Sequence, residues 1–159
     1  MLTALGARRA RLFASLVVVG ALATGCFAGS GQAVPAGGLN RQLFDLVNAD
    51  RAANGLPGFQ WDAQLGGLAQ EWSQQMASTG SFRHRDLNAV INRAGFSSYR
   101  RLGENILLGS CGMSADQVER AWMNSPGHRA NIVGNYNLAG IGTVCRDGRL
   151  WATQNFGLR

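Results

Sequence analysis

The chain has 159 residues and a formal net charge of +6, and its basic residues are all arginine. Three arginines lie among the first eleven residues, and the others are scattered in ones and twos rather than gathered in a stripe. This pattern argues against a nucleic-acid-binding protein, because such proteins concentrate basic side chains on one surface.

An export signal is predicted at the N-terminus. Three arginines precede an apolar run over residues 12–23, and two small residues follow the run. This order is typical of a secretory signal peptide, which we assign to residues 1–25. A run of this length is too short for a membrane-spanning helix, which needs about 20 residues. We therefore expect the protein to be exported.

Cys26 follows the apolar run directly and resembles the lipid-modified cysteine of a bacterial lipobox. The alternative is ordinary signal cleavage after Ala28 or Ala33, which would remove this cysteine. We expect lipid attachment at Cys26, which would anchor the protein to the outer face of the cell membrane. Residues 26–38 lack periodic apolar residues, and we interpret them as a flexible tether.

Residues 39–159 are predicted to form one domain that begins with helices. Leucine and valine at helical spacing predict an amphipathic helix from Leu39 to about Ala53, which a turn rich in glycine and proline ends. Asp62 is expected to cap a second helix. Trp72 and Met76 lie on one face of this helix, and we interpret them as core residues.

Three shorter helices are predicted further along the chain. One begins at Ser114, which is expected to form a capping box with Gln117. Another runs from Pro126 to Ile132, since proline suits the first turn of a helix. A further short helix is predicted over residues 88–94.

The C-terminal part is predicted to form strands. We expect them over residues 102–108, 138–145 and 149–156, with the last two joined by a hairpin turn. The Asp-Gly pair at residues 147–148 indicates this turn. Helices followed by antiparallel strands predict an α+β domain in which helices pack on a small antiparallel sheet.

Cys111 and Cys145 are the two cysteines of the predicted domain. In an oxidising compartment two thiols of a small domain usually pair, so we predict a structural disulfide between them. Metal binding by this pair is not expected, because neither cysteine has the CxxC spacing of zinc sites.

The candidates for chemistry are His84, His128 and Glu104. The chain has only two histidines, and Glu104 interrupts an apolar segment, where a buried carboxylate needs a partner. We hypothesise that the three side chains converge at one end of the sheet. They could then hold a zinc-like ion, form an acid–base pair, or form a buried hydrogen-bond network that fastens loops to the sheet.

No nucleophile motif accompanies these residues. The chain has neither a Gly-x-Ser-x-Gly elbow nor a His-Glu-x-x-His helix. Ser125 is near His128 in sequence, but its place before Pro126 predicts a helix cap rather than a nucleophile.

Several segments resemble the CAP domain family, also called the SCP or cysteine-rich secretory superfamily. These are residues 46–51 with 55–57, His84, residues 103–106, residues 122–132 and residues 151–157. The resemblance extends over nearly all of the predicted domain, and the segments occur in the order typical of the family.

The resemblance implies a three-layer α-β-α sandwich, secretion, and a cleft whose histidine and glutamate cluster binds divalent metal in some members. His84 and Glu104 match the first histidine and the first glutamate of that cluster. Ser125 stands where plant and animal members have a second glutamate, and Trp151 stands where they have a second histidine. These departures favour ligand binding over metal-dependent hydrolysis.

We therefore predict a secreted or lipid-anchored protein of the cell envelope that binds a lipid or cell-wall ligand. The predicted cleft is edged by His84, Glu104 and His128, with Asn105 and Ser125 beside them. The alternatives are a hydrolase that uses a divalent metal such as zinc at the same three residues, and a structural or adhesion module. The modest charge and the single domain predict a monomer.

Overall fold

The computed structural model describes residues 38–159. The predicted signal peptide, Cys26 and the tether up to residue 37 lie outside the described residues, so their assignment stays a prediction. Among residues 38–159, no helix combines the length and the apolar composition that crossing a membrane would require.

The described residues form five helices and four strands. In chain order they are α1 (Leu39–Ala53), β1 (Gln60–Trp61), α2 (Ala63–Thr79), α3 (Leu87–Ile91), β2 (Arg101–Ser110), α4 (Ala115–Met123), α5 (Pro126–Ile132), β3 (Leu138–Arg146) and β4 (Arg149–Leu158). The strands form one sheet in the order β1-β3-β4-β2. β1 pairs with β3 in parallel, and the other neighbours are antiparallel.

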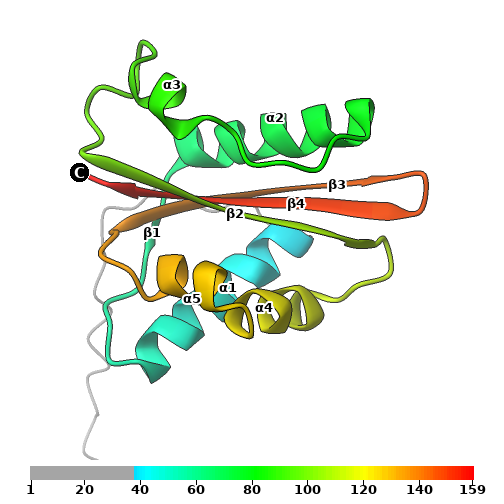
Figure 1. Cartoon of the computed structure of the whole chain (residues 1–159). Helices are drawn as coiled ribbons and strands as arrows, with labels where there is room; N and C mark the ends of the chain where they lie inside the picture. The colour runs from blue at the N-terminus through cyan, green and yellow to red at the C-terminus, as the bar shows by residue number, and fades with distance from the viewer. Residues whose placement is uncertain (1–37) are drawn as a thin grey trace, which may run out of the picture.

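The sheet lies between two helical layers (Figure 1). α2 and α3 cover one face, and α1, α4 and α5 cover the other. The three-layer α-β-α sandwich that the resemblance implies is therefore confirmed. Its larger core lies between the sheet and the α1, α4 and α5 layer, where Val47, Trp122, Ile132 and Phe156 are fully buried.

α2 packs unusually close to the sheet because β3 presents glycines to it. A Cβ atom added at Gly140 would lie 2.1 Å from the backbone nitrogen of Gly66, and one at Gly142 would lie 2.2 Å from that of Gln70. Both neighbours are backbone atoms that cannot move aside. The two glycines therefore fix how α2 lies on the sheet.

Local signals in the sequence place several element ends correctly. The Asp62 side chain accepts hydrogen bonds from the first turn of α2, and Ser114 and Gln117 form the predicted capping box. Asp147 and Gly148 both have positive φ, 51° and 73°, as a two-residue type I′ hairpin turn requires.

Two local predictions need correction. The helix predicted over residues 88–94 is α3, which begins one residue earlier because Asp86 caps it, and which ends at Ile91. The chain then turns toward Gly95, whose φ of +90° suits glycine. Ser125 occupies the N-cap position of α5, but its side chain makes no capping hydrogen bond.

The predicted disulfide between Cys111 and Cys145 is present, with Cα atoms 5.4 Å apart. Cys111 follows the last residue of β2, and Cys145 lies near the end of β3. Because β4 separates these two strands in the sheet, the disulfide joins them around the end at which β4 begins.

Candidate functional site

Glu104 and His84 form the centre of the candidate site. Glu104 lies in β2 with its side chain 2% exposed, whereas the His84 side chain is 58% exposed. Glu104 Oε1 lies 2.9 Å from His84 Nδ1 and accepts a hydrogen bond of 3.0 Å from the backbone N–H of Arg85. A buried carboxylate thus holds an exposed imidazole, with Nδ1 used and Nε2 left for other partners.

Burial is the largest influence on the pKa of Glu104. It raises the pKa of this carboxyl group, and the hydrogen bonds from the Arg85 backbone and from His84 oppose the rise. Glu104 Oε2 is buried and has no hydrogen-bond partner among the described residues. The pair with His84 therefore compensates part of the desolvation cost of this group.

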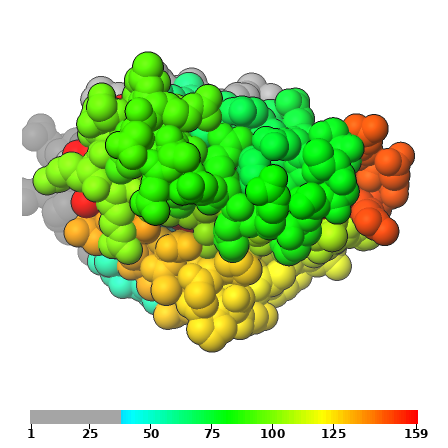
Figure 2. Space-filling model, turned by 45° about the horizontal axis from the view of Figure 1, so that its top comes forward, coloured from blue at the N-terminus to red at the C-terminus, as the bar shows by residue number. Residues whose placement is uncertain are grey.

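His128 lies near this pair, on α5. Its side chain is half-buried, and burial lowers its pKa. A positive charge on His84 lowers the pKa of His128 further. The backbone oxygen of His128 accepts a hydrogen bond from the side chain of Asn105, the residue after Glu104. The structure therefore pairs His84 with Glu104 and packs α5, which carries His128, against β2. In Figure 2 the green segment after α2 lies against the yellow and orange region of α4 and α5. We call the surface along this boundary the seam.

A second set of hydrogen bonds ties α5 to β2 and β4 beneath this seam. The Asn105 amide nitrogen donates to the backbone oxygen of His128 (3.1 Å) and to Gln154 Oε1 (3.2 Å). The Asn131 amide nitrogen donates to Asn105 Oδ1 (2.9 Å) and to the backbone oxygen of Glu104 (3.2 Å). Asn105 is fully buried, so it acts as a connector within the fold and does not contact solvent.

The use of His84, Glu104 and His128 as metal ligands stays a prediction. Within residues 38–159, no three histidine, cysteine, aspartate or glutamate side chains are placed to hold a metal ion. Among the three predicted ligands, the direct contact is the one between His84 Nδ1 and Glu104 Oε1. Trp151 is 2% exposed and packs in the core, and its indole N–H is not a metal ligand.

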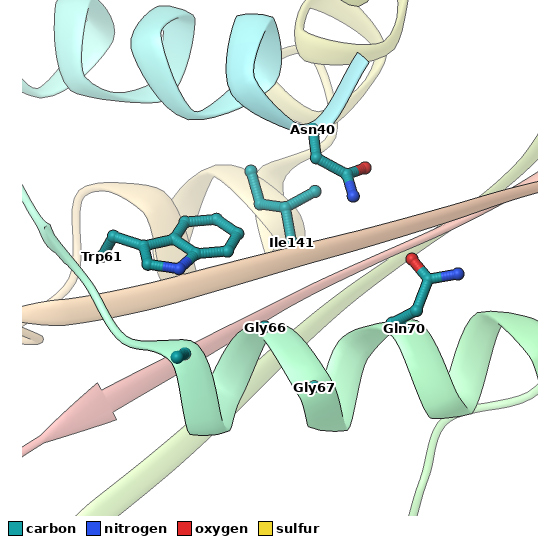
Figure 3. A pocket seen from close by; sticks show the side chains of 7 residues that line it. Asn40, Trp61, Gly66, Gly67, Gln70 and Ile141 are labelled. Carbon is teal, nitrogen blue, oxygen red and sulfur yellow. The ribbon is translucent and has the colours of Figure 1, made fainter. Parts of the chain in front are cut away.

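Four hollows within residues 38–159 are lined by side chains other than those of His84, Glu104 and His128, and the cleft edged by these three residues stays a prediction. One of them, of about 240 Å³, lies at the edge of β3 beyond the short β1 (Figure 3). Trp61, Ile141 and two glycines of α2 make its lining largely apolar. Gln70 covers this strand edge by donating to the backbone oxygen of Thr143 (3.3 Å) and accepting from its N–H (3.2 Å).

Sequence reasoning missed the role of Arg51. This residue is 2% exposed, and its guanidinium donates to the backbone oxygens of four residues, namely Pro57, Ile132, Gly134 and Tyr136. It also stacks on the ring of Phe59 at 3.9 Å. The spacing of Leu43, Val47 and Arg51 on one helix face was the available signal, since a charge on an apolar face indicates a buried partner set.

Comparison with known proteins agrees with this fold. A model of the cysteine-rich secretory protein family, CAP, matches residues 44–156. The uncharacterised protein YkwD of Bacillus subtilis is 34% identical over 123 residues, which cover 74% of this chain and 46% of that protein. The chain thus spans less than half the length of this curated relative.

Two solved structures are similar as well. An extracellular protein with an SCP domain from Bacillus anthracis is 28% identical, with a TM-score of 0.63 over 76% of this chain and 40% of that one. An outer surface protein of Borrelia burgdorferi is 20% identical, with a TM-score of 0.68 over 81% and 98% of the two chains, and shows the same fold. The chain described here belongs to the CAP family of cysteine-rich secretory proteins.

Proposed function

We propose that this chain is an exported CAP-domain protein of the cell envelope that binds a lipid or cell-wall ligand at the seam between His84 and His128. The N-terminal signal pattern supports export, and so do two proteins of similar structure, one an extracellular protein and the other an outer surface protein. Lipid attachment at Cys26 would keep the domain at the membrane surface, where such ligands are abundant.

The observation that carries this proposal is the exposed imidazole of His84 held by the buried carboxylate of Glu104. A surface histidine does not need an oriented carboxylate for folding, and burying Glu104 costs free energy. Such a pair presents Nε2 in a fixed direction, ready to form a hydrogen bond with a ligand. His128 adds a second imidazole whose lowered pKa keeps it neutral at neutral pH.

The two alternatives from the sequence have less support. The hydrolase depends on a metal ion at His84, Glu104 and His128, and no group of three possible metal ligands is found within residues 38–159. A structural or adhesion module would not require the oriented imidazole.

Native mass spectrometry of the full chain tests the proposal with two probes. One probe is a soluble peptidoglycan fragment, and the other is an uncharged monoacylglycerol. We expect a bound complex with one of them, weakened about tenfold or more by His84→Ala and by Glu104→Gln, since each removes a charge-assisted or oriented hydrogen bond. Gln74→Ala, on the exposed side of α2, is the control and should bind as wild type does.

The results of this experiment distinguish ligand binding at His84 from a structural or adhesion role. Equal binding by wild type and His84→Ala would show that the imidazole does not contact the ligand and would refute the proposal. The absence of a complex with either probe would leave the structural or adhesion module as the better account.

A further inference from the structure

A second hollow lies on the other side of the sheet from α1, between α2 and the segment that contains α3. Its volume is about 300 Å³. Three arginines line it, Arg83, Arg85 and Arg93, together with the side chain of Trp72. Two carboxylates, Glu71 and Asp86, lie at it as well, so the guanidinium groups outnumber the carboxylates.

Arg85 is the unusual member of this hollow. Its side chain is only 8% exposed, and its Nε and Nη2 atoms are buried without a hydrogen-bond partner among the described residues. Its Nη1 atom has one long contact, 3.4 Å to Glu71 Oε2. The guanidinium lies over the ring of Trp72, 4.7 Å from the ring centre. A buried guanidinium with unused N–H groups costs free energy, unless a ligand or water satisfies them.

The two carboxylates do not fill this need. Asp86 Oδ1 accepts hydrogen bonds from the backbone N–H groups of Asn88 and Ala89 at the start of α3. The Glu71 side chain is 55% exposed and touches Arg85 only at the long distance given above. Glu71 can therefore move into solvent, whereas Asp86 is held in the helix cap.

The other groups of the hollow are held in place around Arg85. Trp72 Nε1 donates to the backbone oxygen of Arg83 at 3.0 Å, which fixes the chain beside the ring. The guanidinium of Arg83 also lies over this ring, 5.3 Å from its centre. Two guanidinium groups therefore contact the same ring, and the positive charge that they bring to the hollow favours an anion there.

We propose that this hollow is a binding site for a phosphate group. Arginine forks match phosphate oxygens in pairs, and the unused N–H groups of Arg85 are the donors such a group requires. The volume exceeds that of a single phosphate, so the group would be carried on a larger molecule. This site uses side chains other than His84 and Glu104, and it stands or fails independently of the function proposed above.

The rim must move slightly for the phosphate to reach Arg85, because its Nε and Nη2 atoms are shielded from solvent. Glu71, Gln75, Arg83 and Arg93 are among the exposed residues that line this hollow. Glu71 competes directly with an incoming phosphate for Arg85 Nη1. Removing the charge of Glu71 should therefore strengthen phosphate binding.

The test is an NMR titration of the full chain with inorganic phosphate, in which the arginine Nε–H signals are followed. We expect the signal of Arg85 to shift with saturation. Arg93→Gln should weaken binding about threefold to tenfold, and Glu71→Gln should tighten it about threefold. Arg41→Gln, on α1 in the opposite layer, removes an equal charge and is the control. Arg85→Gln should abolish binding if the variant folds.

Vesicles then identify the source of the phosphate. Phosphatidylglycerol vesicles that compete with free phosphate for the arginine site, where phosphatidylcholine vesicles do not, would identify anionic headgroups as the source. Competition by neither vesicle would identify a soluble phosphate compound. The proposal would be overturned if phosphate left the Arg85 signal unchanged, or if Arg41→Gln and Arg93→Gln weakened binding equally.

Discussion

Glu119 is buried between α4 and α1, and replacing it with glutamine should change how stability depends on pH. The residue is 3% exposed, and neither carboxyl oxygen has a hydrogen-bond partner among the described residues. Burial raises the pKa of Glu119 to about 8, and the nearby carboxyl group of Asp50 contributes to the rise. Both groups line a hollow of about 140 Å³, where Asp116 and Arg120 pair with each other.

The size of the effect follows from the difference in pKa between folded and unfolded chain. The ordinary value of 4.5 applies when the chain is unfolded, and the value of about 8 applies when it is folded. The folded state therefore binds more protons across this interval, and stability falls as pH rises through it. At about 1.4 kcal/mol for each pH unit, the free energy of unfolding loses about 3 to 4 kcal/mol between about pH 5 and about pH 8.

The assay is urea denaturation of wild type and Glu119→Gln at both pH values. Glutamine does not ionise, so the variant should not lose this stability. Its free energy of unfolding minus that of wild type should therefore increase by about 3 to 4 kcal/mol from the lower to the higher pH. Glu71→Gln, whose side chain is 55% exposed, serves as the matched control, and its difference from wild type should stay nearly constant. A constant difference for Glu119→Gln as well would show that Glu119 ionises normally and would refute the reasoning.

Other predictions concern stability. Replacing Cys111 and Cys145 by serine should lower the free energy of unfolding by about 4 kcal/mol, as expected for a loop of 34 residues. Gly140→Ala should cost about 2 kcal/mol or more in a denaturant titration, because the new methyl group meets the α2 backbone. Gly67→Ala, which has open space, should instead stabilise α2 by up to about 1 kcal/mol. Arg51→Lys should lower the thermal midpoint and cost about 3 kcal/mol, because lysine cannot reach all four carbonyl groups. No loss of stability in either Gly140→Ala or Arg51→Lys would contradict the packing described here.

Local chemistry made most of the elements predictable. The periodicity of the first helix, the cap at Asp62, the capping box at Ser114 and the Asp-Gly turn all depend on residues close in sequence. These signals act within a few residues, so tertiary packing did not change them. The helix over residues 88–94 was less well predicted, because its end is set by the chain reversal toward Gly95.

The site depended on contacts that sequence spacing does not encode. His84 and Glu104 are 20 residues apart, and they meet because β2 returns beneath the segment that follows α2. Glu119 has the appearance of an ordinary charged residue of an amphipathic helix, and only the packing of α1 against α4 buries it. The sequence likewise does not show that Arg85 packs over the ring of Trp72, or that its Nε and Nη2 atoms are buried there without a hydrogen-bond partner.

An NMR titration of His128 tests most directly whether His84 and His128 share one surface. In wild type, burial and the charge of His84 should hold the pKa of His128 below its ordinary value of 6.5. His84→Gln removes that charge, and the pKa of His128 should then rise measurably toward the ordinary value. An unchanged pKa of His128 in the variant would mean that the two imidazoles do not interact, and it would contradict the site proposed here.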